Sequence, residues 1–132
     1  MKSFQPFSVR RRFRSLTHAF AGLKILLQTQ HNARIHAMAG ASVLALAWWL
    51  EVGRIKFLFL IGSITNVWAA EAFNTTCEIL LNIVAAKYSV KVKRAKDIAA
   101  AGVFLAVAGA TATGLLILGP PFCRRLAHFF NP

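Results

Sequence analysis

The chain has 132 residues, of which 57% are hydrophobic and only 15% are charged. A water-soluble domain of this length needs a polar surface, so the composition excludes an ordinary soluble protein and predicts helices in a membrane. The net charge of +12 could suggest a nucleic-acid partner, but the distribution of the cations favours a membrane and no nucleic acid. The length suits a single domain, residues 1–132, built from a few helices.

The first predicted element is an amphipathic helix over about residues 8–29. Its apolar side chains recur in alternating steps of three and four residues, which is the period of a helix, and basic residues fall away from that stripe. Such a helix lies well in the headgroup layer of an anionic membrane, so we expect it on the membrane surface. The alternative is a nucleic-acid-binding arm made from residues 10–14. The stripe consists of Phe13, Leu16, Phe20, Leu23 and Leu27.

Three apolar segments follow, at about residues 33–51, 56–86 and 97–118, and we interpret them as transmembrane helices. The last contains a run of 21 residues without a charge, Ile98–Leu118, which is long enough to cross a hydrocarbon core about 30 Å thick. The second exceeds that thickness, so its C-terminal third should reach the headgroup region or beyond. The predicted fold is therefore an all-α membrane protein with one surface helix and three spans.

The basic residues are divided unequally between the two sides of these spans. Seven lie before or at the start of the first span and five lie between the second and third, whereas two lie at the connection between the first and second and two in the tail. Basic residues accumulate on the cytoplasmic side of membrane proteins. This places the N-terminus and residues 87–96 in the cytoplasm and the C-terminus outside.

Only four residues are acidic, and three of them fall close together in the sequence, at Glu71, Glu78 and Asp97. Glu71, Asn74, Glu78 and Asn82 follow one another in steps of three, four and four, so they share one helix face. Carboxylates are costly near the bilayer core, so this face must contact other helices or water. A polar seam that only joins helices is the alternative, although two carboxylates exceed what a seam requires.

Lys96 and Asp97 directly precede the last apolar run, at the cytoplasmic depth expected for Glu78. Asp97 could merely cap the following helix, and Lys96 could merely extend its ammonium to the headgroups. Carboxylates clustered beside cations are nevertheless typical of a site that holds a metal–phosphate complex. The pattern therefore predicts phosphoryl transfer, at a site that differs from the P-loop because G-x-x-x-x-G-K-[ST] is absent from the sequence.

The motif EAFNTTCE at residues 71–78, followed by KDIAA at residues 96–100, resembles the prokaryotic diacylglycerol kinase/undecaprenol kinase family. The family pattern reads E-x-x-N-T-A-I-E-x-x-x-D and then A-K-D-x-A-A-G-A-V, and the resemblance covers about residues 10–119. It implies a multi-pass kinase of the bacterial inner membrane, working as a homotrimer with active sites between subunits. It implies transfer of the γ-phosphate of ATP, with Mg²⁺, to the hydroxyl of diacylglycerol or undecaprenol at the cytoplasmic interface.

The resemblance also implies roles for individual residues. Glu78 matches the general base and a metal ligand of the family, which would take the proton of the lipid hydroxyl. Glu71 and Asn74 match polar residues that line the nucleotide and metal site, and Lys96 and Asp97 match nucleotide contacts. A small multidrug-type transporter would explain an acidic Glu71 inside the membrane, but it would not explain the pair at 96 and 97.

Two positions depart from the family pattern. Gln30 stands where members usually carry a glutamate as a further metal ligand, and Asn82 stands where they usually carry an aspartate. An amide oxygen can coordinate Mg²⁺ but lacks the ionic attraction of a carboxylate. The alternative to a lipid kinase is therefore a weakened or inactive relative that serves as a trimeric membrane scaffold or lipid-binding protein.

Overall fold

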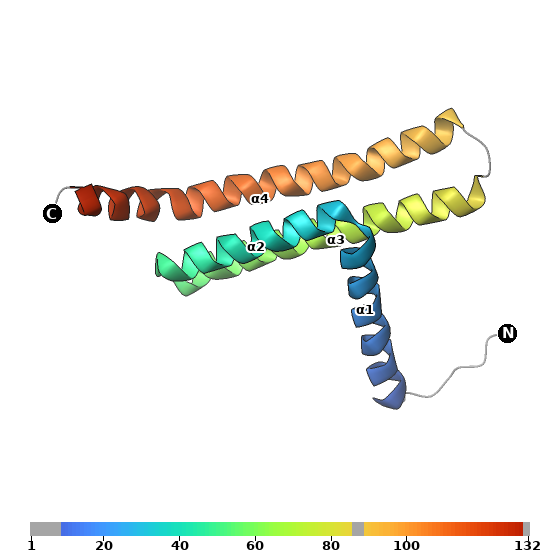
Figure 1. Cartoon of the computed structure of the whole chain (residues 1–132), viewed down its shortest axis with the longest axis horizontal. Coiled ribbons are helices and arrows are strands. Elements are labelled where there is room, and N and C mark those ends of the chain that lie inside the picture. Colours follow the sequence, from blue (N-terminus) through green and yellow to red (C-terminus); the bar gives the residue numbers. More distant parts are fainter. Residues whose placement is uncertain (1–8, 86–88, 131–132) are drawn as a thin grey trace.

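The structure is a computed structural model that describes residues 9–85 and 89–130, with side chains from Phe13 onward. These residues form four helices and no strand, which confirms the predicted all-α membrane fold: α1 (Val9–Thr29), α2 (His31–Trp49), α3 (Arg54–Val84) and α4 (Val90–Phe130). Helices α2 and α3 pack side by side in opposite directions, α4 runs back along α3, and α1 projects away from the other three (Figure 1).

A single residue makes the corner between α1 and α2. Gln30 has an extended backbone, with φ −104° and ψ 118°, and its amide donates to the carbonyl of Leu26 at 2.9 Å. The apolar stripe of α1 is exposed, with Phe13 at 67% and Phe20 at 70%, whereas Leu26 near the corner is buried. An apolar stripe that faces no protein fits a helix lying in the membrane surface. The predicted start at residue 8 lies outside the described residues.

Helices α2 and α3 approach closely because α2 presents small residues to α3. Ala33 and Ala47 are fully buried. A side chain at Gly40 would place its Cβ 3.1 Å from the Ile64 Cγ2, so there is little space for anything larger. Small residues at the contact are the usual means of packing helices in a membrane. Lipid tails are as apolar as the side chains, so helices associate through close van der Waals contact and not through the hydrophobic effect. Ala47 also joins a buried cluster with Leu50, Leu60 and Leu118, which ties α4 to the pair.

Two of the four helices, α3 and α4, are long and apolar enough to cross a membrane. Within the described residues, α2 falls short of that criterion, because its 19 residues include a polar and basic first turn with Asn32 and Arg34. Its crossing stays a prediction.

The structure corrects the predicted bounds of the last helix. Helix α4 has 41 residues, or about 61 Å, and begins at Val90 instead of residue 97 and ends at Phe130 instead of residue 118. Residues 90–96, expected in a connection, form its first two turns, because lysine, arginine and alanine are good helix formers wherever water can solvate their charges. Pro120 and Pro121 remove two backbone donors without ending the helix.

The turn between α2 and α3 is closed by a pair of backbone hydrogen bonds. Glu51 donates to the carbonyl of Trp48 at 3.1 Å, and Val52 donates to the carbonyl of Ala47 at 3.2 Å. This is the Schellman pattern, in which the residue after the helix adopts the left-handed conformation that favours glycine. Here that residue is Glu51, with φ 54°.

The same turn is tied to the far end of α4. The carbonyl of Trp49 accepts a hydrogen bond from Arg125 Nη1 at 2.9 Å, and the guanidinium carbon lies 4.7 Å from the centre of the Trp49 ring. The C-terminal carbonyls of a helix carry partial negative charge, so a cation there is stabilising, and stacking on the indole adds to the attraction. Residues 76 positions apart in the sequence thus fix where α2 and α4 meet.

We predict that Glu51→Gly stabilises the protein. A left-handed conformation costs a residue with a side chain about 1–2 kcal/mol, which glycine avoids, although its greater freedom in the unfolded chain cancels part of the gain. The free energy of unfolding in detergent micelles should rise by about 1 kcal/mol. Glu51→Ala is the control, because it removes the charge and keeps the strain. A gain in Glu51→Ala equal to that in Glu51→Gly would show that the charge, and not the backbone, is responsible.

Candidate active site

The predicted polar face lies on the C-terminal half of α3 and is buried at one end. Glu71 is 2% exposed, Asn74 and Thr75 are buried, and Glu78 is half-buried. The α1–α2 corner crosses the C-terminal half of α3, and beyond that point only α4 accompanies α3 (Figure 1). The face therefore runs from the interior of the helix bundle, at Glu71, to its open end, past Glu78.

Several oxygens on this face have no hydrogen-bond partner among the described residues. They are Glu71 Oε2, Asn74 Oδ1 and Thr75 Oγ1. Asn74 Nδ2 donates to Glu78 Oε1, at a long 3.5 Å. A buried polar group without a partner costs about 1–3 kcal/mol, so these residues do not serve stability. Such a cost is typical of residues that bind a ligand.

Lys96 reaches this face from α4. Its Nζ donates to Asn82 Oδ1 at 2.7 Å, a contact between side chains of α3 and α4. Because the two helices run in opposite directions, this contact sets their register and places Glu78 level with Ala99 and Ala100, whose side chains are small. Lys96 thus contacts the face that bears Glu78, at Asn82.

Asp97 is placed differently from Lys96. Its Oδ2 accepts from Lys93 Nζ at 2.6 Å on the same helix, and both side chains are more than half exposed. The alternative that Asp97 caps the last helix is wrong, because α4 begins seven residues earlier, at Val90. In the described residues, the carboxylate of Asp97 is engaged with its own helix and not with α3.

Gln30 occupies the corner at the buried end of the face. It is partly buried, and its side chain makes no capping hydrogen bond to α2. The contact of Gly40 with Ile64 sets the antiparallel register of α2 and α3, which places residue 30 level with Asn74, one helical turn from Glu78. This position is consistent with the predicted approach of Gln30 to Glu78 from the side.

Within residues 9–85 and 89–130, no three His, Cys, Asp or Glu side chains gather as a metal-binding group. Binding of a metal ion by Glu78 and Gln30 stays a prediction. The donor set of the face does fit Mg²⁺, because the unpartnered carboxylate and amide oxygens of Glu71 and Asn74 are the kind of ligand that this ion prefers. Magnesium is usually held by one or two carboxylates together with substrate phosphates.

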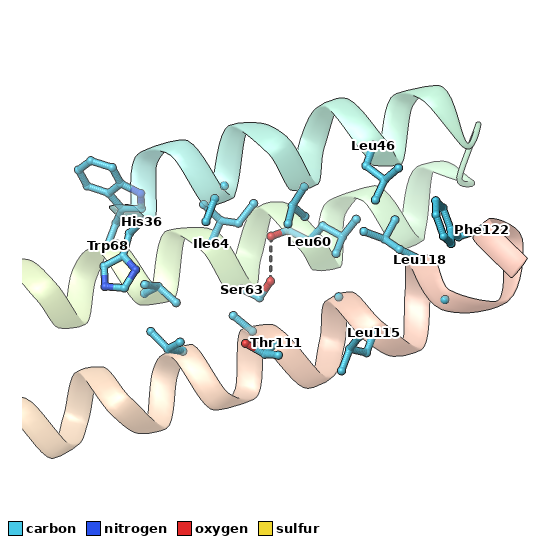
Figure 2. A pocket seen from close by; sticks show the side chains of 18 residues that line it. His36, Leu46, Leu60, Ser63, Ile64, Trp68, Thr111, Leu115, Leu118 and Phe122 are labelled. Carbon is cyan, nitrogen blue, oxygen red and sulfur yellow. Dashed lines mark hydrogen bonds between the residues drawn. The ribbon is translucent and has the colours of Figure 1, made fainter. Parts of the chain in front are cut away.

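A separate apolar cavity of about 420 Å³ lies between α2, α3 and α4. Figure 2 shows it extending from His36 and Trp68 at one end to Phe122 at the other. None of the predicted site residues lines it, although Trp68 is only three positions from Glu71. The cavity is lined mainly by apolar side chains, with His36, Ser63 and Thr111 as polar members, and the described residues that line it include no carboxylate or lysine.

The fold and the site define a small helical membrane protein whose carboxylate, amide and lysine groups meet near one end of two antiparallel helices. The family model described as "Prokaryotic diacylglycerol kinase" matches residues 17–118. The chain belongs to this family of membrane lipid kinases.

Individual relatives agree with the family match. A diacylglycerol kinase from Synechocystis sp. is 34% identical over 108 residues, covering 81% of this chain and 62% of that protein. A diacylglycerol kinase from Escherichia coli is 27% identical over 105 residues, covering 80% of this chain and 86% of that protein. The chain thus spans less than two thirds of the Synechocystis protein and most of the Escherichia coli protein.

Two features of the site were missed in the sequence. Thr75 is buried with its hydroxyl unpartnered, whereas the neighbouring Thr76 donates to the carbonyl of Ala72 at 2.8 Å. In the sequence, burial of Thr75 was indicated only by its position four residues after Glu71, which puts it on the same helix face. The bond between Asn82 and Lys96 was also missed, because it depends on the register of α3 against α4.

We predict that Thr75→Val stabilises the protein. Valine keeps the shape of threonine and removes a buried hydroxyl that has no partner, so the free energy of unfolding should rise by about 1 kcal/mol. Thr76→Val is the matched control, because its exposed hydroxyl is already bonded to its own helix, and its effect should be close to zero. Thermal unfolding in one detergent would compare the two. Destabilisation by Thr75→Val would show that its hydroxyl has a partner in the folded protein.

Proposed function

We propose that this protein is an ATP-dependent lipid kinase that transfers the γ-phosphate of ATP to the hydroxyl of a membrane lipid, either diacylglycerol or undecaprenol. The observation that carries the proposal is the polar face of α3, where Glu71 and Asn74 keep unpartnered oxygens inside the bundle and Lys96 reaches over from α4. Membership of a lipid kinase family, with the matched region including every one of these residues, supports it.

In this proposal, Glu78 is the catalytic residue. A lipid hydroxyl is a weak nucleophile, and the carboxylate of Glu78 would accept its proton. The hydroxyl oxygen then bonds to the γ-phosphorus as the bond from phosphorus to the bridging oxygen of the ADP leaving group breaks. Asn74 positions Glu78 through the bond from its side-chain amide. Half-burial of Glu78 at the open end of the bundle lets both a lipid and a nucleotide approach.

Phosphate binding falls to the cation at the edge of the face. Lys96 presents its ammonium beside α3, held by the neutral amide of Asn82 and not by a carboxylate. The charge of the lysine is therefore not neutralised by its partner and remains available to a nucleotide phosphate. Glu71 and Asp97 complete the nucleotide site in this proposal. To contact the nucleotide, Asp97 would break its exposed ion pair with Lys93, which costs at most about 1 kcal/mol.

Mg²⁺ would be held by Glu78, next to the unpartnered oxygens of Glu71 and Asn74, with the amide oxygen of Gln30 as a weaker ligand. When bound, it would neutralise the charge of the phosphates during transfer. The substitution of glutamine for the usual glutamate predicts weaker affinity for the ion, because an amide contributes no net charge.

The surroundings of the face suit a lipid acceptor. The apolar cavity begins at Trp68, one helical turn from Glu71, and could receive a hydrocarbon chain while the hydroxyl remains at the polar face. We place the site at the cytoplasmic surface of the bacterial inner membrane, with the N-terminus in the cytoplasm. We also propose a homotrimer, in which a neighbouring subunit covers the open side of α3 next to Glu78.

Replacement of Glu78 tests the proposed chemistry. Glu78→Gln keeps the shape and loses the base, so kcat should fall by at least about 100-fold in mixed micelles that contain labelled ATP and either lipid. Glu51→Gln removes a carboxylate at the opposite end of α3 and should leave kcat unchanged. Asn82→Ala should cost much less than Glu78→Gln, because it frees Lys96 without removing it. Near-normal turnover of Glu78→Gln would disprove the assigned role.

The inactive-relative alternative has one specific observation in its favour, which is the loss of two carboxylates at Gln30 and Asn82. A carboxylate restored at residue 30 distinguishes a lipid kinase from an inactive scaffold. If Gln30 lies beside the metal, Gln30→Glu should lower the Mg²⁺ concentration for half-maximal activity, by up to about tenfold if the carboxylate binds the ion directly. A matched Gln28→Glu change, on the exposed side of the preceding turn, should leave that concentration unchanged.

The two functions predict different results at high Mg²⁺. Lipid phosphorylation by the wild-type protein, enhanced by Gln30→Glu at low Mg²⁺, supports the kinase. If wild type and Gln30→Glu both fail to phosphorylate every lipid alcohol at saturating Mg²⁺, the kinase is excluded and the scaffold function takes its place.

A further inference from the structure

The last part of α4, residues 119–130, lies beyond the region that matches the family model, which ends at residue 118. We call it the C-terminal segment. It continues α4 as helix past Pro120 and Pro121, and its function is not explained by the proposed kinase site at the opposite end of the bundle (Figure 1).

The C-terminal segment has one apolar face and one basic face. The apolar residues Phe122, Leu126, Phe129 and Phe130 recur at the spacing of a single helix face, and all are exposed, with Phe129 at 79% and Phe130 at 73%. The basic residues Arg124 and His128 lie on the opposite side of the same turns, and Arg125 lies at the edge between the two faces, against Trp49. A helix with exposed aromatic groups on one side and cations on the other is typical of a segment at a membrane surface.

The tertiary structure brings further exposed cations and aromatic rings next to the C-terminal segment. The contact of Arg125 with Trp49 brings the turn between α2 and α3 next to the C-terminal segment. That turn contributes the exposed cations Arg54 and Lys56 and the exposed indole of Trp48. Glu51 is the only acidic residue in the two regions, residues 48–56 and 119–130. Cations and aromatic rings from distant parts of the sequence therefore gather at one end of the bundle.

The length of α4 fixes the depth of this cluster in a membrane. Helix α4 is about 61 Å long, whereas the hydrocarbon core is about 30 Å thick, so α4 extends past the core. The uncharged run Ile98–Leu118 fills the core. The C-terminal segment then begins where the hydrocarbon gives way to the headgroups, which is where aromatic residues and cations are favourable.

We propose that the C-terminal segment, together with the turn region at residues 48–56, is an anchor that binds the anionic headgroups of phospholipids. The cations contact the lipid phosphates, and the exposed aromatic rings of the segment lie against the headgroup layer beside them. Exposed aromatic rings next to the cations favour a lipid surface over a nucleic acid or an acidic peptide, because only the lipid offers apolar depth directly below the anions. Arg125, held by Trp49, fixes the orientation of the segment.

The exposed thiol of Cys123 within the segment permits a direct test. In full-length protein carrying Cys77→Ala, Cys123 is labelled with an environment-sensitive fluorophore, and the protein is placed in nanodiscs of phosphatidylcholine with or without phosphatidylglycerol. We expect phosphatidylglycerol to shift the emission to the blue and to reduce quenching by aqueous iodide. Arg124→Gln combined with His128→Gln should abolish this difference between the two lipid compositions.

Matched changes distinguish a local effect from general charge or misfolding. Lys91→Gln combined with Arg94→Gln removes two exposed cations at the other end of α4 and should leave the lipid-dependent shift intact. Phe129→Ser combined with Phe130→Ser should weaken the shielding of the fluorophore in both lipid compositions. Circular dichroism of each variant checks that the helices persist.

Three results would overturn the anchor. The first is a fluorophore that stays fully accessible to iodide in both lipids. The second is a phosphatidylglycerol effect that survives in the Arg124→Gln, His128→Gln variant. The third is shielding that depends on protein concentration and not on lipid composition, which would assign the segment to contacts between protein chains.

Discussion

The high cost of a carboxylate in hydrocarbon is the constraint on which this structure depends. Glu71 lies on α3, a helix apolar enough to cross a membrane, and is almost completely buried. A side chain of this kind cannot face lipid, so α3 must be covered on that side by other helices. The α1–α2 corner provides the cover on one side and α4 on the other. Small residues make this possible, since Ala33 and Gly40 let α2 lie close against α3.

The two ends of the bundle are held by different interactions. At the end that carries the polar face, Lys96 and Asn82 join α4 to α3 through a hydrogen bond between a cation and a neutral amide. At the other end, a helix C-terminus is closed by backbone hydrogen bonds and by Arg125, which satisfies the carbonyl of Trp49. The first arrangement leaves a charge free for a ligand. The second uses its charge to hold the fold together.

Stability and function are opposed on the polar face. A helix bundle with so few buried residues gains little from its core, yet it keeps Glu71, Asn74 and Thr75 buried with unpartnered oxygens. Among the described residues, no hydrogen bond to these oxygens offsets the cost. That is the pattern expected of a binding site, where groups are held ready for a ligand and not for one another. Because Gln30 and Asn82 are neutral amides, the region carries less negative charge than carboxylates at these positions would give, which lowers the cost of assembling the site without a metal ion.

The sequence by itself determined the fold class, the approximate extent of the first three helices and the composition of the polar face. These follow from local periodicity: the stripe from Phe13 to Leu27 and the steps from Glu71 to Asn82 each require only that the segment be helical. The start of α4 was wrong, because the basic residues before Asp97 resemble a connection in composition and are equally good helix formers once water solvates them.

The tertiary structure decided which groups meet. The bond between Lys96 and Asn82 and the stacking of Arg125 on Trp49 depend on the register of helices that are separated in the sequence, and nothing in either segment alone specifies that register. Burial of Thr75 has the same origin. A helix face can be assigned from residue spacing, but whether that face is covered, and by which neighbour, is settled only when the small residues of one helix pack against the next.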